Sequence, residues 1–308
     1  MRPPAFWAAG PDHPAARCLA PLGAAYGALV ARRMDRPGAR AGCPILCLGN
    51  FTLGGAGKTP AALALAAVVA ALGRTPAFLS RGYGGRTAGP VQVDLARHDA
   101  DAVGDEPLLL ARRAPTVVSR DRPAGAALCR ALGADTIVMD DGLQNPSLVK
   151  DLGLAVIDGP AGLGNGLPVP AGPLRAPLDR LARAAEARGL PVHRARLVRE
   201  TDDLAGRRCL AFAGIGRPDK FFATLAEAGA VIAATRPFPD HHRYRSGELA
   251  ALAAEAQRLG ADLVTTEKDA ARLPPAFAAR VRVLRVRLAF DDAGALRRQV
   301  QGALAGAP

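Results

Sequence analysis

A short glycine-rich segment carries the residues with the clearest chemistry. Residues 52–59 read Thr-Leu-Gly-Gly-Ala-Gly-Lys-Thr, which has the glycines, lysine and hydroxyl of a phosphate-binding loop (P-loop). In such a loop the backbone N–H groups surround the phosphates, the lysine reaches the β- and γ-phosphate oxygens, and the hydroxyl holds Mg²⁺. We therefore expect the whole segment to bind a nucleoside triphosphate through the residues Thr52, Leu53, Gly54, Gly55, Ala56, Gly57, Lys58 and Thr59.

One residue departs from the usual P-loop pattern. The opening glycine of the motif should fall at position 52, where this chain has Thr52. The flanking segments still predict the loop, because residues 44–48 have the composition of a buried parallel strand and residues 59–72 that of a helix. A glycine-rich turn that binds no ligand is the alternative interpretation.

A second strand-like run ends in two carboxylates. Residues 136–139 are of the strand-forming type, and Asp140 and Asp141 follow directly. Sheets of α/β proteins bind ligands at the carboxyl ends of their strands, and P-loop proteins place a carboxylate there in the Mg²⁺ shell. We expect Thr59, Asp140 and Asp141 to serve Mg²⁺, although adjacent aspartates before Gly142 are also typical of a turn.

The composition restricts the class of nucleotide-binding protein. The chain contains no Asn-Lys pair, which is part of the NKxD loop that reads guanine in GTPases. Aromatic residues make up only 4% of the chain and the arginines are scattered along it, so we expect no nucleic-acid partner. The formal net charge of +12 still favours an acidic partner, such as a phosphorylated ligand or an anionic membrane.

Further polar, glycine-rich clusters follow one another along the chain. They are residues 80–85 (SRGYGG), 104–107 (GDEP), 140–144 (DDGLQ), 171–175 (AGPLR), 238–244 (FPDHHRY) and 265–269 (TTEKD). Together with the P-loop, this series resembles the tetraacyldisaccharide 4'-kinase family, the lipid A 4'-kinases, over about residues 47–272. The resemblance implies transfer of the γ-phosphate of ATP, with Mg²⁺, to the 4'-hydroxyl of a tetraacyldisaccharide 1-phosphate. The product is lipid IVA, in lipid A and lipopolysaccharide biosynthesis.

The same resemblance implies roles for individual residues. Asp105 would accept the proton of the acceptor hydroxyl, with His241 paired to it, and Arg122 would neutralise charge on the transferring group. Read alone, Asp105 is equally a carboxylate at a helix N-terminus and His241 a residue of a surface loop. Three further residues would contact substrate or nucleotide: Tyr83, Gln144 and Arg175.

Two positions leave questions open. The family commonly has a glutamate after the arginine of its AGPLR cluster, whereas this chain has Ala176, so any contact of that carboxylate is lost or supplied elsewhere. Lys268 of the TTEKD cluster is one of only four lysines in the chain. It is either a group of the site or part of a solvated loop.

An apolar segment near the start of the chain is flanked by arginines. Residues 18–31 (CLAPLGAAYGALVA) are shorter than the roughly 18 apolar residues that a membrane-spanning helix needs. A helix here would lie at a membrane surface or pack on the protein's own core. The resemblance favours the membrane. It implies a peripheral, monotopic protein on the cytoplasmic face of the bacterial inner membrane, with a glycolipid substrate.

These residues require a frame of parallel strands. Strand-like runs at 77–80, 116–119, 136–140 and 154–158 alternate with helical segments. This alternation predicts an α/β fold with a P-loop NTPase-type, mostly parallel sheet between layers of helices. A second, smaller α/β series begins at 208–216 and continues with a helix at 246–259 capped by Ser246, and strands at 262–266 and 281–288.

We expect four regions. They are a membrane-associating, amphipathic helix region (1–40), a P-loop nucleotide-binding kinase domain (41–190), a linker (191–205) and a C-terminal α/β domain (206–308). The last contributes His241, so the active site should lie in a cleft between the domains of a monomer. Two other functions stay open: a P-loop kinase of a soluble small molecule, and a P-loop ATPase that switches a partner at a membrane surface.

Overall fold

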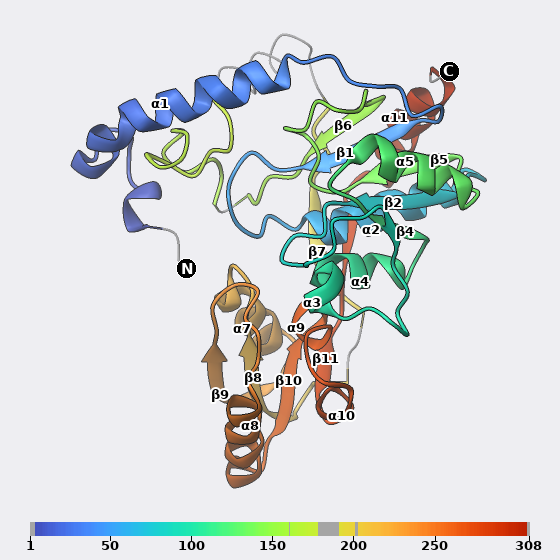
Figure 1. Ribbon diagram of the computed structural model, residues 1–308. Helices are drawn as coiled ribbons and strands as arrows, with labels where there is room; N and C mark the ends of the chain where they lie inside the picture. Colours follow the sequence, from blue (N-terminus) through green and yellow to red (C-terminus); the bar gives the residue numbers. More distant parts are fainter. Residues whose placement is uncertain (1–3, 160, 178–190, 201–202, 307–308) are drawn as a thin grey trace.

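Two sheets of mainly parallel strands dominate the structure, and they lie one above the other in Figure 1. The computed structural model describes residues 4–159, 161–177, 191–200 and 203–306. The upper sheet has the strand order β3-β4-β2-β5-β1-β6, in which only β3 runs antiparallel to its neighbour among the described strands. Its strands are β1 (Ile45–Gly49), β2 (Pro76–Ser80), β3 (Val91–Gln92), β4 (Thr116–Val118), β5 (Thr136–Met139) and β6 (Leu152–Ala155).

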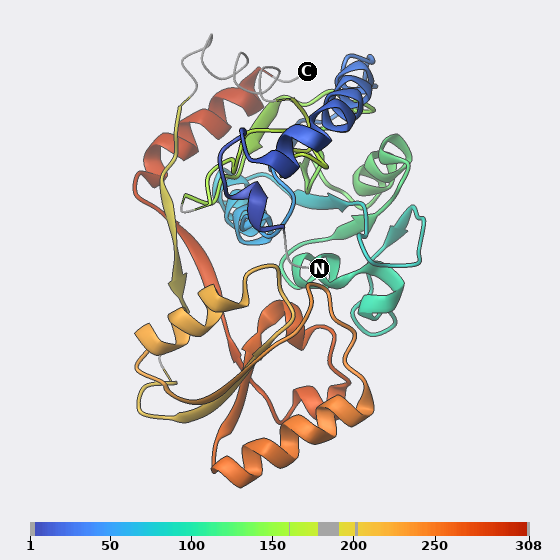
Figure 2. The ribbon, with the colours of Figure 1, turned by 90° about the vertical axis from the view of Figure 1, so that its left-hand side faces the viewer.

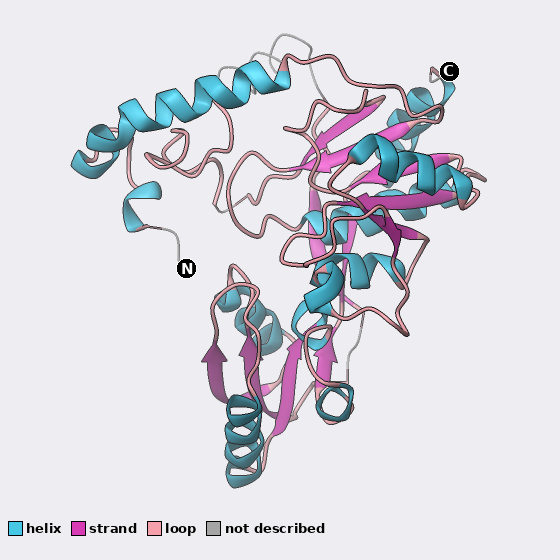
Figure 3. Ribbon diagram, in the orientation of Figure 1, coloured by secondary structure: helices cyan, strands magenta, loops and turns pink. Residues whose placement is uncertain are grey.

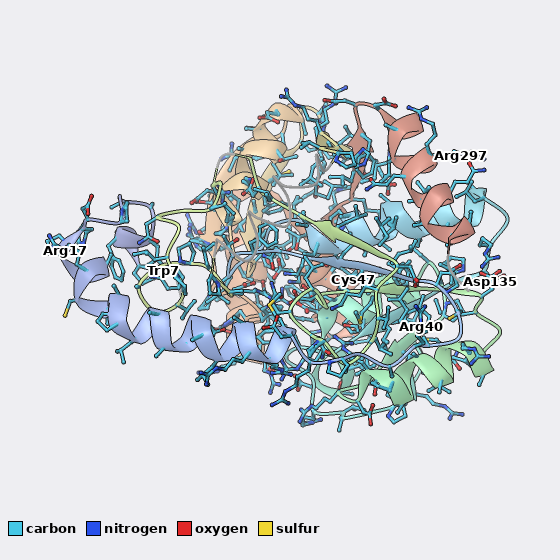
Figure 4. All side chains as sticks on the ribbon, turned by 90° about the horizontal axis from the view of Figure 1, so that it is seen from above. Trp7, Arg17, Arg40, Cys47, Asp135 and Arg297 are labelled. Atoms are coloured by element: carbon cyan, nitrogen blue, oxygen red, sulfur yellow. The ribbon has the colours of Figure 1, made fainter. Side chains whose placement is uncertain are left out.

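The upper sheet is covered on both faces, which explains the continuous apolar runs of its strands. Side chains alternate along β1, so that Leu46 and Leu48 pack with α2 (Lys58–Ala71) while Ile45 and Cys47 face α5 (Arg122–Ala131). Cys47, near the middle of Figure 4, is fully buried. The α/β fold with a mostly parallel sheet between helices is therefore confirmed.

The lower sheet repeats this construction on a smaller scale. Its strands run parallel in the order β11-β10-β8-β9, with α7 (Pro218–Glu227) on one face and α8 (Ser246–Leu259) on the other. Figure 3 shows helices on both sides of these strands. The strands are β8 (Arg208–Ala213), β9 (Val231–Pro237), β10 (Asp262–Thr266) and β11 (Arg282–Leu284), and two short helices follow β10, α9 (Glu267–Ala270) and α10 (Pro275–Ala278).

The start of α8 differs in one detail from the sequence expectation. The N-cap is Arg245 rather than Ser246, which is the first helical residue. The cap is made by Glu248, whose side chain accepts a hydrogen bond of 2.8 Å from the backbone N–H of Arg245.

A two-stranded antiparallel ribbon joins the sheets. It pairs β7 (Ala195–Arg199) with β12 (Val286–Phe290), so the segment expected to be a linker contains a strand. The single strand expected over 281–288 is two strands, because β11 belongs to the lower sheet and β12 to the ribbon. Figure 2 shows the chain running from the ribbon into α11 (Ala293–Ala305).

The last helix returns to the upper sheet. Leu296 and Val300 of α11 are buried in the same cluster as Leu65 and Val69 of α2. The core of the upper lobe therefore includes residues that the sequence grouped with the C-terminal domain. The lower sheet, residues 208–284, is inserted between the two strands of the ribbon. We call the two bodies the upper and the lower lobe.

The N-terminal helices lie beside the upper lobe at the top left of Figure 1. Trp7 of the short helix η1 (Ala5–Trp7), labelled in Figure 4, donates from its indole N–H to the carbonyl oxygen of Pro170 (3.1 Å). Helix α1 (Pro14–Met34) packs through small residues: a Cβ on Gly23 would lie 2.8 Å from the Pro168 carbonyl oxygen. Within the ranges that the structure describes, no helix has the length and apolar content to span a membrane.

Candidate active site

The P-loop follows β1 and ends at the first turn of α2. Gly57 is the N-cap of this helix with φ 85°, and Gly54 has φ 107°, so both adopt backbone conformations that favour glycine. Lys58 is buried, and its Nζ donates to Asn50 Oδ1 at 3.3 Å. The Asn50 amide in turn donates to the carbonyl oxygen of Gly54 (3.3 Å). Asn50, which the sequence analysis did not single out, therefore links the lysine to the loop.

The first half of the P-loop pairs with the 171–175 cluster. The N–H of Leu53 donates to the Pro173 carbonyl (2.8 Å), and the N–H of Arg175 donates to the Phe51 carbonyl (2.8 Å). Between these bonds Thr52 forms an antiparallel bridge with Leu174. An extended, bridged position suits a β-branched residue, which explains why threonine is tolerated where the motif usually has glycine.

Asp141 and Arg175 form the closest ion pair beside this loop. Arg175 Nη1 lies 2.7 Å from Asp141 Oδ1 and 2.8 Å from Oδ2, and Arg175 Nε donates to the Thr52 carbonyl (3.2 Å). Lys58 Nζ is 3.8 Å from Asp141 Oδ2. Gln144 donates to the carbonyl of Asn50 (2.9 Å). In this structure both predicted contact residues, Gln144 and Arg175, therefore hold the P-loop and its neighbour Asp141.

Asp140 offers the better place for a cation. It is 1% exposed, and neither carboxylate oxygen has a hydrogen-bond partner in the described part of the chain. Burial, together with the charges of Glu106 and Asp141, raises the pKa of the Asp140 carboxyl. A buried carboxylate without partners is costly, and a divalent cation would relieve that cost. These residues therefore fit Mg²⁺, which Asp140 and the buried Thr59 would hold.

Among the residues described, no group of three His, Cys, Asp or Glu side chains could hold a metal ion on its own.

Arg122, at the start of α5, lies next to Asp140 and is 2% exposed. Its Nη2 donates to the Asp140 carbonyl (3.4 Å), whereas its Nη1 has no partner within the described ranges. Burial lowers the pKa of the Arg122 guanidinium, and the charge of Asp140 opposes this shift.

Asp105 is the first residue of α4 (Asp105–Ala111) and is 3% exposed. Its Oδ2 lies 3.1 Å from His241 Nδ1, and its Oδ1 accepts from the backbone N–H of Glu106 (2.9 Å). Burial alone would raise the pKa of Asp105. The hydrogen bond from His241 and the charges of Lys268 and Arg272 outweigh burial and lower this pKa to about 2. The carboxylate is therefore ionised at neutral pH.

His241 reaches Asp105 from the lower lobe, in the loop that follows β9. It has φ 56°, a conformation uncommon outside glycine, and its backbone N–H donates to the Gly214 carbonyl (3.0 Å). Its ring packs edge-on against Tyr83, with the ring centroids 5.2 Å apart. Tyr83 itself is 64% exposed, so its side chain lies at the open rim of the site. The structure thus brings together Asp105, His241 and Tyr83, which are far apart in the sequence.

Two cations of the lower lobe complete the surroundings of Asp105. Lys268 Nζ lies 2.9 Å from Glu106 Oε1, and Arg272 Nε lies 3.2 Å from Asp105 Oδ2. Lys268 is therefore part of the site rather than of a solvated loop. Sequence reasoning missed Glu106 and Arg272, although Arg272 stands three residues after Asp269 and its helical spacing is a weak signal for a shared face.

The geometry defines a class of enzyme. A phosphate-binding loop lies next to a buried carboxylate that fits a cation. An ionised carboxylate that contacts a histidine lies close by. This combination of groups is typical of a P-loop phosphotransferase. The family model of the tetraacyldisaccharide-1-P 4'-kinases matches residues 15–305. The chain therefore belongs to this family of kinases, as the order of its clusters predicted.

Curated relatives agree over the whole length. A tetraacyldisaccharide 4'-kinase of Methylobacterium radiotolerans is 79% identical, with 100% of both chains covered. One of Methylorubrum populi is 65% identical, with 99% of both covered. Among solved structures, LpxK from Aquifex aeolicus in complex with ATP shares the fold at a TM-score of 0.73 and 23% identity, covering 94% of this chain and 99% of that one.

Proposed function

We propose that this site transfers the γ-phosphate of ATP to the 4'-hydroxyl of a tetraacyldisaccharide 1-phosphate. The observation that carries the proposal is the contact of Asp105 with His241, which joins a carboxylate of the P-loop lobe to a histidine of the other lobe. Family membership supports the lipid substrate, and the ATP complex of the Aquifex structure supports the nucleotide. We expect the active unit to be a monomer.

Each residue has a distinct task in this proposal. Lys58 and the N–H groups at the start of α2 hold the β- and γ-phosphates. Thr59 and Asp140 would hold Mg²⁺, which would neutralise charge on the phosphates. Asp105 accepts the proton of the 4'-hydroxyl at a carboxylate oxygen, and His241 keeps this carboxylate oriented through Nδ1. Arg122 adds positive charge behind Asp140.

The test is transfer of radiolabelled γ-phosphate from ATP to the lipid acceptor in mixed micelles. We expect labelled lipid with the parent, and losses of about 10²- to 10⁴-fold in kcat for Asp105→Asn. Lys58→Ala should lose ATP binding as well. Asp203→Asn is the matched control, because the Asp203 side chain is 57% exposed and forms an ion pair with Arg282 at the far side of the lower lobe.

Two outcomes would contradict the proposal. ATP hydrolysis without labelled lipid would favour the alternative function of an ATPase at a membrane surface. Transfer of phosphate to a soluble acceptor in preference to the lipid would favour a kinase of a soluble small molecule. Full activity of Asp105→Asn would remove the proton-accepting role while leaving the substrate assignment intact.

We also propose that α1 lies on an anionic membrane, at the cytoplasmic face of the bacterial inner membrane. The helix turns its small residues inward, while Leu22 and Leu29 are 61% and 67% exposed on the opposite face with Tyr26 between them. Exposed arginines flank this face: Arg17, Arg32, Arg33 and Arg36. An apolar face bordered by arginines favours adsorption to anionic headgroups.

Vesicle sedimentation tests this second proposal. With vesicles containing anionic phospholipid, the double variant Leu22→Glu/Leu29→Glu should bind at least about tenfold more weakly than the parent, since two apolar contacts are lost and two like charges are added. The control Ala24→Glu/Ala28→Glu adds the same charge at exposed positions away from the leucines. Equal losses in both variants would mean that net charge alone governs binding.

A further inference from the structure

The TTEKD cluster places a buried arginine against the catalytic carboxylate. Its last residue, Asp269, lies in α9, and Arg272 follows one turn later. The Arg272 side chain is only 6% exposed. Its Nε lies 3.2 Å from Asp105 Oδ2 and donates to the Lys268 carbonyl oxygen (3.2 Å). Nη1 and Nη2 donate to the carbonyl oxygens of His242 (3.1 Å) and Gly214 (3.0 Å). One guanidinium thus touches the upper lobe and two loops of the lower lobe.

Asp269 holds this guanidinium in place. Asp269 is fully buried, and its Oδ1 lies 3.3 Å from Arg272 Nη2. The same carboxylate accepts hydrogen bonds from the Tyr244 hydroxyl (2.7 Å), the Gly214 N–H (2.8 Å) and the Thr266 hydroxyl (2.7 Å). A buried carboxylate with this many donors has little freedom to move, so the arginine that it orients has a fixed direction.

Arg272 and His241 meet at the same oxygen atom of Asp105. His241 Nδ1 is 3.1 Å from Asp105 Oδ2, and the other oxygen, Oδ1, accepts from the Glu106 N–H. We propose that Arg272 is a positioning residue, which fixes the Asp105 carboxylate for proton acceptance and binds the loop that carries His241 to the same place. This inference rests on the proposed function, because it assumes that Asp105 accepts the proton.

An arginine suits this task better than a lysine. The five N–H donors of a guanidinium form a planar fork, which here reaches two carboxylates and three carbonyl oxygens, whereas an ammonium is a compact point charge. A purely structural role in joining the lobes is less well supported, because Lys268 makes a separate ion pair with Glu106 across the same boundary. Loss of Arg272 therefore leaves other ion pairs between the lobes, among them Lys268–Glu106 and Arg243–Asp101.

Electrostatics agree with this geometry. The charged groups around Asp105 are Glu106 on its own helix, Lys268 and Arg272 from the segment after β10, and His241 with the neighbouring Asp240 from the loop after β9. The pKa of Asp105 is about 2, so the acidic limb of the parent's pH profile lies below the range of practical assays. Without the Arg272 charge this limb should move upward by about one to three pH units.

The experiment compares kcat and KM of Arg272→Gln and Arg272→Lys with the parent in the lipid-labelling assay from acidic to alkaline pH. We expect kcat of Arg272→Gln to fall about 10²-fold, with little change in KM for ATP and an acidic limb displaced upward. Arg272→Lys should restore the position of this limb but only part of kcat. Guanidinium ion added to Arg272→Ala should raise its kcat.

Arg282→Gln is the matched control, since Arg282 also bridges two aspartates of the lower lobe, Asp203 and Asp262, but at the surface. Thermal unfolding shows whether each variant is folded, and Arg272→Lys keeps the test informative if Arg272→Gln is not. A parental pH profile and parental kcat in folded Arg272→Gln or Arg272→Lys would overturn the inference. Failure of the parent to label lipid would instead overturn the proposed function.

Discussion

Arg175 and Asp141 show how single side chains set the shape of the P-loop. Arg175 contacts both oxygens of Asp141 and the carbonyl of Thr52, so it joins the carboxylate after β5 to the start of the loop. A lysine at this position would keep the charge but lose the planar fork. The pair adjoins the P-loop, and we propose that it supports nucleotide binding without touching the atoms that react.

We predict that Arg175→Lys raises KM for ATP by about tenfold and lowers the free energy of unfolding by about 1 kcal/mol, a small value because the two side chains are 21% and 30% exposed. Steady-state kinetics and urea unfolding measure the two quantities. Arg74→Lys is the control, because Arg74 pairs with Asp135 at the opposite end of the strands. Equal effects in both variants would speak against a specific role of Arg175.

At this scale the sequence predicted residue types better than partners. The P-loop was recognisable from spacing alone, because a phosphate cradle is made by consecutive residues. The pairing of Asp105 with His241 needed the family resemblance, since the residues lie 136 positions apart. The contact of Arg272 with Asp105 was not predictable, because it depends on how α9 packs against α4.

Among the elements, the junction of α3 (Ala100–Val103) and α4 has the strictest requirement. Gly104 joins the two helices with φ 89° and ψ 160°, a region open almost only to glycine. A Cβ at this position would lie 2.5 Å from the carbonyl oxygen of Tyr83. Since Asp105 is the next residue, this junction sets the direction of the side chain that we propose as proton acceptor.

We predict that Gly104→Ala lowers the free energy of unfolding by about 2 to 3 kcal/mol and reduces kcat as well. Gly133→Ala separates the two causes, because Gly133 has a similar φ of 87° but nothing within 4 Å of its Cβ position. This control should cost about 1 kcal/mol and leave kcat unchanged. If both variants lose the same free energy of unfolding in urea, backbone strain rather than the steric clash with Tyr83 accounts for the loss.

Elements with strong local signals were predicted well. The expected helix at 246–259 and strand at 262–266 coincide with α8 and β10. The expected strand at 154–158 is instead β6 at Leu152–Ala155, and the run at 281–288 divides between two sheets. Both differences depend on which neighbouring strand each segment pairs with, and the composition of an apolar segment does not determine its pairing partner.

The two lobes respond to pH as one molecule, because Asp105 of the upper lobe is held by cations of the lower. Its pKa of about 2 lies below the ordinary value of 3.8. A carboxyl group with a lowered folded-state pKa contributes stability above its unfolded pKa and loses it as the pH falls through the folded value. The contribution is about 2 kcal/mol at neutral pH.

We predict that this part of the stability disappears between about pH 4 and pH 2. Urea unfolding at a series of pH values should show a shallower pH dependence for Asp105→Asn than for the parent in this window. Arg272→Lys, which keeps the charge, should resemble the parent. A pH dependence equally steep in Asp105→Asn would show that other carboxyl groups account for it.

The return of α11 to the upper sheet has a consequence for how the protein is made. Leu296 and Val300 fill the core beside α2, yet the ribosome adds them only after the whole lower lobe has been synthesised. The P-loop helix therefore emerges long before the residues that cover it. The six described strands of the upper sheet are synthesised before the lower lobe, but α11, which completes their core, is synthesised last. Nascent chains halted before residue 293 should contain a folded lower lobe beside an upper lobe whose apolar face is still open to chaperones.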